Sequence, residues 1–131
     1  MINYLHIEHP FALESGESLP SLTAAYNTYG QLNEAGNNVI WICHALTANS
    51  DAEDWWPGLV GEGFTLDPAD YFIVCVNMLS SSYGSTSPKS IDPKTGEPYG
   101  LNFPLVTTRD QARFFDLVAD YLGIRRIRLL M

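Results

Sequence analysis

A run of five apolar residues, from Val39 to Cys43, limits the possible folds of this chain more than any other part of its sequence. A short, continuously apolar run predicts a strand buried on both faces, as in a parallel sheet. The run stops at the segment His44 to Thr47, which we expect to form a loop at the carboxyl end of the strand. Ligands and catalytic groups gather at this edge of open α/β sheets. The loop is therefore the first place to look for a functional site.

The rest of the sequence predicts further strands around this central one. Residues 71–77 and 125–131 have the composition of buried strands. Residues 4–13 and 20–29 are expected to be two strands separated by a turn, and the alternation within 20–29 favours an antiparallel or edge strand. Together with the central run, these segments predict a sheet.

One helix and one long loop complete the predicted elements. Residues 108–111 have the form of a capping box, and the apolar face that follows predicts a helix through residue 122. Residues 78–106 contain many Gly and Pro residues, and a loop of this length inside a compact domain is typically functional or disordered. The order strand, crossover, strand, helix, strand predicts an α/β fold with parallel units.

Charge and composition argue against several classes of partner. The net charge of -8 and the pI near 4.6 disfavour nucleic acid and anionic membranes. No run approaches the roughly 18 apolar residues of a membrane span, and the first residues do not have the pattern of a signal peptide. Cys43 and Cys75 lie inside apolar runs, which indicates buried thiols in a reducing compartment. We therefore expect a cytoplasmic protein with no nucleic-acid or membrane partner.

Three local patterns suggest chemistry but have better structural explanations. Gly58, Gly61 and Gly63 match neither the dinucleotide-binding nor the P-loop spacing. The neighbouring Cys43 and His44 would point to opposite faces of a strand, which disfavours a thiol nucleophile paired with that imidazole. The carboxylates between residues 51 and 54 are expected to be solvated groups at the start of a helix, and no metal site is predicted.

A series of short motifs occurs along the whole chain. They are Leu19-Pro20, Tyr26-x-x-Tyr29-Gly30, Cys43-His44-Ala45-Leu46-Thr47, Trp55-Trp56, Asn77, Gly84-Ser85-Thr86, Pro93-Lys94-Thr95-Gly96, Pro98-Tyr99-Gly100, Phe103-Pro104, Val106-Thr107-x-Arg109-Asp110 and Leu122-Gly123. In this order and at these spacings, the chain resembles the homoserine O-acetyltransferases, which are acyltransferases of the α/β-hydrolase fold. The resemblance extends over essentially all 131 residues.

The resemblance implies a fold class and an incomplete domain. The family fold is a mostly parallel, eight-stranded sheet with helices on both faces and a helical lid added later in the chain. Residues 1–131 are then expected to be a partial α/β-hydrolase domain, the N-terminal portion of that fold, truncated before the nucleophile elbow. The Ser/Asp/His triad, the second oxyanion donor and the lid would lie beyond Met131, so this chain is expected to be inactive alone.

The resemblance also implies a reaction and a role for one residue. The family transfers an acetyl group from acetyl-CoA, a co-substrate, to L-homoserine, which gives O-acetyl-L-homoserine and CoA in methionine biosynthesis. No resident cofactor is expected, and the complete enzyme is expected to be a homodimer. By the resemblance, the backbone N–H of Leu46 is one oxyanion-hole donor. His44 is expected to be a structural histidine bonded to nearby backbone, because the family's base comes near the C-terminus.

The sequence differs from the family pattern at two positions, and it is compatible with several alternative functions. Family members usually have Gly where this chain has Ser80 and Ser87, and the loss of two glycines restricts the backbone beside the site. A homoserine O-succinyltransferase or a serine O-acyltransferase of the same fold would show similar motifs in this segment. A non-catalytic truncated remnant that acts only as an interaction module is the alternative from a different functional class.

Overall fold

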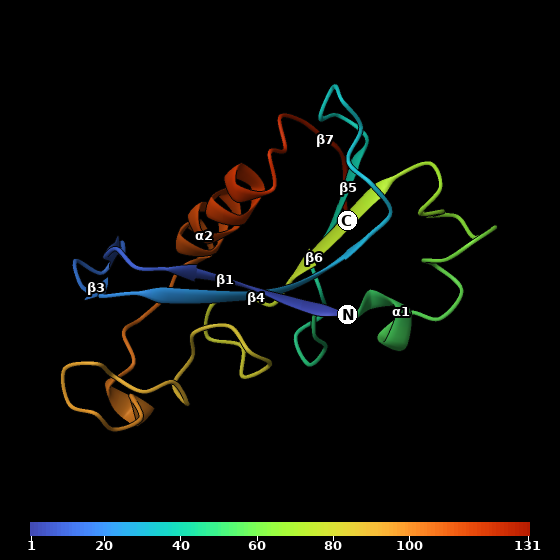
Figure 1. Ribbon diagram of the computed structural model, residues 1–131. Coiled ribbons are helices and arrows are strands. Elements are labelled where there is room, and N and C mark those ends of the chain that lie inside the picture. The colour runs from blue at the N-terminus through green and yellow to red at the C-terminus, as the bar shows by residue number, and fades with distance from the viewer.

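A mixed five-stranded sheet forms the centre of the computed structural model, which describes residues 1–131 (Figure 1). Its strands, in spatial order, are β1 (Ile2–Ile7), β4 (Leu22–Tyr29), β6 (Phe72–Val76), β5 (Val39–Ile42) and β7 (Ile127–Leu130). The β1–β4 and β4–β6 pairs are antiparallel, whereas β5 is parallel to both β6 and β7. The predicted α/β class is confirmed, and within this chain the parallel part of the sheet begins at β6.

The two central strands, β5 and β6, are buried on both faces. Every residue of Val39–Ile42 and Phe72–Val76 is buried. Their alternate side chains enter two separate apolar cores, because successive residues of a strand point to opposite faces. The helix α2 (Thr108–Tyr121) packs on one core and the short α1 (Ala52–Trp55) on the other. The central predicted strand, the predicted strand 71–77 and the predicted helix are confirmed.

The first predicted strand is divided in two. β1 ends at Ile7, and after His9 and Pro10 the separate strand β2 (Phe11–Ala12) pairs with β3 (Ser18–Leu19) in a small hairpin. Proline has no N–H to donate to a sheet ladder, which explains the interruption. The predicted strand 20–29 corresponds to β4, which is antiparallel to both of its neighbours. It is therefore internal to the sheet, and of the two predicted alternatives only the antiparallel one is correct.

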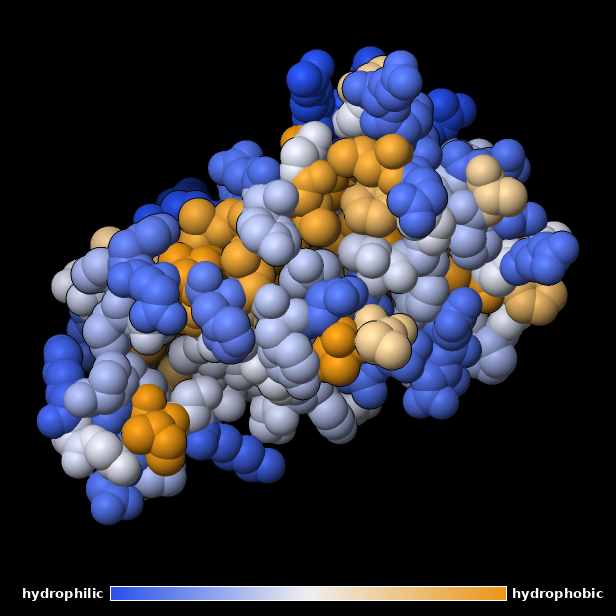
Figure 2. Space-filling model, viewed as in Figure 1, coloured by the Kyte–Doolittle hydropathy of each residue, from blue (hydrophilic) through white to orange (hydrophobic).

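The last strand, β7, lies at the edge of the sheet. Residues 125–131 have the composition of a strand buried within a larger sheet, but all four residues of β7 are exposed, because no strand pairs on its far side. An apolar cavity of about 180 Å³ lies between β7 and α2, where Trp41, Phe115 and Leu130 are among its lining residues. In Figure 2, apolar residues gather in the upper part of the molecule, where Figure 1 places β7 and α2.

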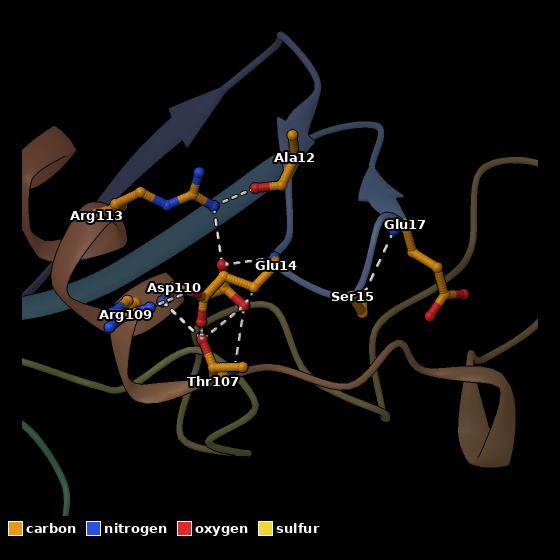
Figure 3. A network of polar contacts seen from close by, with 8 residues as sticks. All are labelled: Ala12, Glu14, Ser15, Glu17, Thr107, Arg109, Asp110 and Arg113. Carbon is orange, nitrogen blue, oxygen red and sulfur yellow. Dashed lines mark hydrogen bonds and ion pairs between the residues drawn. The ribbon is translucent and has the colours of Figure 1, made fainter.

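The N-terminus of α2 is tied to the β2–β3 hairpin by a network around Asp110 (Figure 3). The capping box is formed by Thr107 and Asp110, one residue earlier than predicted, because the Thr107 hydroxyl accepts the Asp110 N–H. The Asp110 carboxylate also accepts the N–H of Glu14 at 3.1 Å and pairs with Arg113 at 2.8 Å. Burial raises the pKa of Asp110, but hydrogen bonds from the Thr107 and Glu14 N–H groups outweigh it, and the net pKa is lowered.

The long segment between β6 and α2 folds back on the sheet. It contains one 3₁₀ turn, η1 (Gly100–Asn102). The Ser85 hydroxyl accepts the N–H of Ala25, and Thr86 exchanges two hydrogen bonds with Thr23 of β4, one through its hydroxyl and one through its N–H. These contacts fix the segment against the antiparallel half of the sheet. None of the helices in the structure has the length and apolar character needed to cross a membrane.

Candidate functional site

The loop after β5 lies at the carboxyl edge of the parallel strands, as predicted. The N–H of Cys43, directly after β5, donates to the carbonyl of Met131 at 2.7 Å, and the N–H of Met131 donates to the carbonyl of Trp41 at 2.9 Å. The carboxyl end of β7 therefore lies beside the first residues of the loop from His44 to Thr47. Loops that leave neighbouring parallel strands at one edge form the crevice where α/β proteins bind ligands.

His44 joins two loops through hydrogen bonds to their backbones. Its side chain is 5% exposed. The ring Nδ1 lies 2.8 Å from the carbonyl oxygen of Ala45, and Nε2 accepts the N–H of Met78 at 3.1 Å. An N–H donor on one side and an acceptor on the other require the neutral ring with its proton on Nδ1. The prediction of a histidine bonded to nearby backbone is confirmed, and neither ring nitrogen is free to act as a base.

Leu46 lies at the tip of the loop. The Ala48 N–H donates to the Ala45 carbonyl at 2.9 Å, so residues 45–48 form a turn with Leu46 at its second position. The side chain of Leu46 is 97% exposed. The N–H of Leu46 has no acceptor within the chain. An unpaired N–H at this edge of the sheet is available to a bound group.

A buried polar network beside this loop was not predicted. The side-chain oxygen of Asn77, directly after β6, accepts the Ser50 N–H at 2.8 Å, and its amide nitrogen donates to the Ser50 hydroxyl and to the Tyr83 carbonyl. The Ser50 hydroxyl donates in turn to Asn27 of β4 at 2.8 Å. Asn27, Ser50 and Asn77 are each at most 2% exposed. Two polar residues within or directly after apolar strands, Asn27 and Asn77, were the sequence signal for this network.

A cavity of about 240 Å³ opens next to the network. It is lined by Ile2, Asn27, Asn49, Ser50, Asp51, Asn77 and Tyr83. The Asp51 carboxylate accepts a hydrogen bond from the Tyr29 hydroxyl at 2.9 Å. Burial and this hydrogen bond raise the pKa of Tyr29, which therefore remains a donor. The amide nitrogen of Asn27 has no hydrogen-bond partner within the chain, so the cavity can accept a small polar group.

Neither thiol has the properties of a nucleophile. Burial raises the pKa of Cys43, and burial, together with the neighbouring Cys43 and Asp51, raises the pKa of Cys75 to about 12. A reactive cysteine needs a lowered pKa, because the thiolate is the nucleophile. The two cysteines are not bonded to each other.

No serine of this chain has the local sequence of a nucleophile elbow. The hydroxyls of Ser50 and Ser85 are held in buried hydrogen bonds to Asn27 and to the Asn77 carbonyl. None of the serines lies in a Gly-x-Ser-x-Gly sequence. The 131 residues therefore contain one candidate oxyanion donor and no candidate triad.

The two departures from the family pattern have different consequences. Ser80 has φ of +79°, the only non-glycine residue of the chain with positive φ. Ser80 thus adopts the left-handed conformation that glycine accepts without cost. Ser87 does not have positive φ, and its hydroxyl accepts the N–H of Lys89 at 3.3 Å. The expected backbone restriction therefore affects the loop at Ser80, two residues after Met78.

Comparisons with known sequences point to one group of proteins. No family model matches the sequence. The chain is 51% identical over 125 residues to a homoserine O-acetyltransferase of Moorella thermoacetica, which covers 88% of this chain and 33% of that protein. It is 49% identical over 122 residues to a homoserine O-acetyltransferase of Chlorobium chlorochromatii, with 93% of this chain and 34% of that protein covered. The chain thus spans about a third of the length of the curated relatives it matches.

Comparisons with solved structures agree on the fold. The homoserine O-acetyltransferase from Bacillus anthracis matches 100% of this chain and 39% of its own, with a TM-score of 0.88 and 33% identity. Esterase E22 matches 99% of this chain and 40% of its own, with a TM-score of 0.87 and 29% identity. Nearly the whole chain is therefore similar to a segment that makes up about a third of the length of homoserine O-acetyltransferases, and it has the N-terminal part of an α/β-hydrolase fold.

Proposed function

We propose that these 131 residues are the N-terminal segment of a homoserine O-acetyltransferase that transfers an acetyl group from acetyl-CoA to L-homoserine. The observation that carries the proposal is the 45–51% identity to proteins of that name over 88–98% of the chain. Acetyl-CoA and homoserine are then the small-molecule partners, with acetyl-CoA as a co-substrate and no resident cofactor. The proposal includes a homodimer as the assembly and the cytoplasm, where amino acids are synthesised, as the location.

The proposed reaction has two acyl-transfer steps. A serine hydroxyl gives its proton to the general base as its oxygen attacks the thioester carbonyl, the carbon–sulfur bond breaks, and CoA leaves with that proton. The hydroxyl oxygen of homoserine then attacks the acetyl-enzyme and gives its proton to the same base. The base passes this proton to the serine oxygen as the ester bond to serine breaks, which releases O-acetyl-homoserine and the free serine. Each step passes through an oxyanion that needs two well-placed N–H donors.

We assign one of these donors to the backbone of Leu46. The support for this assignment is the position of the Leu46 N–H in the turn after β5 and its lack of an acceptor within the chain. Because the side chain of Leu46 is exposed to solvent and packs on nothing, we assign its role to the backbone N–H. A free N–H in a tight turn keeps its direction without reorganising when charge develops on the substrate.

The remaining catalytic groups are proposed to come from residues beyond Met131. Support comes from the position of Met131, whose backbone is bonded to Trp41 and Cys43 just before the loop of Leu46. A serine placed directly after β7 would lie next to that loop. The proposal therefore treats residues 1–131 as a partial domain, inactive alone, with the nucleophile, base and acid in the rest of the polypeptide.

Ester hydrolysis is the second candidate function. It is favoured by the similarity in fold to esterase E22 and to an acetylester hydrolase from Corynebacterium glutamicum, with TM-scores of 0.87 and 0.84. In that reaction water replaces homoserine in the second step, and the first step is unchanged. The lower identities to these two proteins, 29% and 26%, make it the weaker candidate.

A chimera tests the proposal. Residues 1–131 replace the matching third of the Moorella thermoacetica relative, and the product is assayed with acetyl-CoA or succinyl-CoA and with homoserine, serine or water as acceptor. We expect O-acetyl-homoserine to be the main product. A preference for succinyl-CoA or serine would select one of the related transferases, and hydrolysis without transfer to homoserine would select the esterase. A folded chimera that performs none of these reactions would support the alternative that residues 1–131 are a non-catalytic remnant.

A further inference from the structure

We propose that His44 is a positioning residue that aims the Leu46 N–H toward the site of the oxyanion. This inference rests on the proposed function, because it assumes that Leu46 donates to a reacting carbonyl oxygen. His44 does not touch that oxygen itself. It acts through the peptide group that joins Ala45 to Leu46.

The geometry of that peptide group carries the inference. The carbonyl of Ala45 and the N–H of Leu46 belong to one planar unit, and the chain has no cis peptide bond. In a trans peptide the C=O and N–H bonds point in opposite directions. His44 Nδ1 donates to the Ala45 oxygen at 2.8 Å, and the Ala48 N–H donates to the same oxygen at 2.9 Å. With the carbonyl held inward by two donors, the Leu46 N–H must point away from His44.

The hydrogen bond of His44 Nε2 fixes the orientation of the imidazole ring. His44 is buried, and its Nε2 accepts the N–H of Met78, in the segment after β6. The imidazole therefore spans from the end of β6 to the turn after β5, and its orientation is fixed at both ends. An oxyanion donor contributes most when it is held in place before the reaction. A flexible side chain at position 44 would leave only the Ala48 bond to hold the peptide.

Two conservative substitutions separate the two ends of the ring. In His44→Asn, the amide nitrogen can occupy the place of Nδ1 and keep the bond to Ala45, but nothing reaches Met78. In His44→Gln, the amide oxygen can occupy the place of Nε2 and keep the bond to Met78, but the donor to Ala45 is lost. Both variants lose one hydrogen bond, so a purely structural role predicts similar losses of thermal stability and activity.

The experiment uses the active chimera, with His9→Gln as the matched control on an exposed histidine. We expect His44→Gln to lower kcat for acyl-enzyme formation by up to about a hundredfold, the size reported for loss of one oxyanion donor, with KM for acetyl-CoA nearly unchanged. His44→Asn should keep most of kcat, and His9→Gln all of it. Equal losses of kcat in both His44 variants, or a change confined to KM, would overturn the proposal.

A second measurement does not depend on activity. The residual dipolar coupling of the Leu46 N–H reports the direction of that bond in solution. It should change in His44→Gln and stay as in the parent in His44→Asn. An unchanged coupling in His44→Gln would overturn the positioning role. If the parent chimera makes no O-acetyl-homoserine, the proposed function fails, and the dipolar coupling still decides whether His44 sets the peptide orientation.

Discussion

The side chain of Gln111 forms two hydrogen bonds with the backbone of Leu79. Its amide oxygen accepts the Leu79 N–H at 2.9 Å, and its amide nitrogen donates to the Leu79 carbonyl at 2.7 Å. Gln111 lies in the first turn of α2, and Leu79 is 1% exposed in the segment after β6. The neighbouring residue, Met78, donates to His44. Helix α2 is thereby linked through Leu79, Met78 and His44 to the loop that contains Leu46.

Replacing Gln111 should therefore destabilise the fold and loosen the loop. Gln111→Ala leaves the buried N–H and carbonyl of Leu79 without partners, and we expect a loss of about 1–3 kcal/mol in the free energy of unfolding. Asp120→Ala, an exposed position in the same helix, is the control and should change stability by less than about 0.5 kcal/mol. Urea denaturation of the chimera measures both. If both variants lost the same free energy of unfolding, the hydrogen bonds of Gln111 would contribute nothing measurable to stability.

Glycine at position 80 should stabilise the protein, although glycine at position 87 should not. Ser80 has φ of +79°, and a left-handed conformation costs a non-glycine residue about 1–2 kcal/mol. Part of this gain is offset by the greater freedom of glycine in the unfolded chain, so we expect Ser80→Gly to raise stability by about 0.5–1 kcal/mol. Ser87→Gly gains nothing and loses the bond to Lys89. A destabilised Ser80→Gly variant would show that its backbone is not strained.

The parts of the fold that sequence predicts are those set by local pattern. The continuous apolar runs of β5 and β6 and the apolar face of α2 identify these elements without tertiary information. The apolar composition of β7 predicts a strand but not its exposure, which depends on whether another strand pairs on its far side. The division of the first predicted strand follows from Pro10, which interrupts the ladder within residues 4–13.

The candidate site was predicted only in part. The apolar run up to Cys43 locates the loop, but only the family resemblance singles out Leu46, since a backbone N–H has no sequence signature. The network of Asn27, Ser50 and Asn77 joins residues from three separate segments. Such partners are brought together by the sheet register, which places Asn27 opposite Cys75. The sequence shows the polar residues but not their pairing.

Two substitutions at position 46 should differ strongly in their effect on the activity of the chimera. Leu46→Ala keeps the N–H and removes an exposed side chain, so activity should change little. Leu46→Pro removes the N–H, and proline suits the second position of the turn, so the loop should persist. Loss of one oxyanion donor costs about 2.7–4 kcal/mol in the transition state. The rate of acylation by acetyl-CoA is the measurement, and equal rates in the two variants would contradict the role of the Leu46 N–H.

The 131 residues expressed alone should self-associate through the edge of the sheet. The exposed fractions of Ile127, Leu129 and Leu130 in β7 are 41%, 45% and 63%, and such an edge also offers unpaired backbone groups. Size-exclusion chromatography should show species larger than a monomer, and Leu130→Lys should reduce them. Tyr4→Lys, on the opposite edge strand β1, is the matched control and should have less effect. A monodisperse monomer with slow amide exchange across β7 would contradict this expectation.

Intact-mass measurement of acetyl transfer shows whether this chain supplies an oxyanion donor but no nucleophile. The 131-residue chain and the chimera are each incubated with acetyl-CoA, then with homoserine. We expect that the chain alone gains no acetyl group, whereas the chimera gains one acetyl group that homoserine removes as O-acetyl-homoserine. If the chain alone became acetylated and homoserine removed that acetyl group, the nucleophile would lie within residues 1–131. A folded chimera that never becomes acetylated would show that this segment does not serve acetyl transfer.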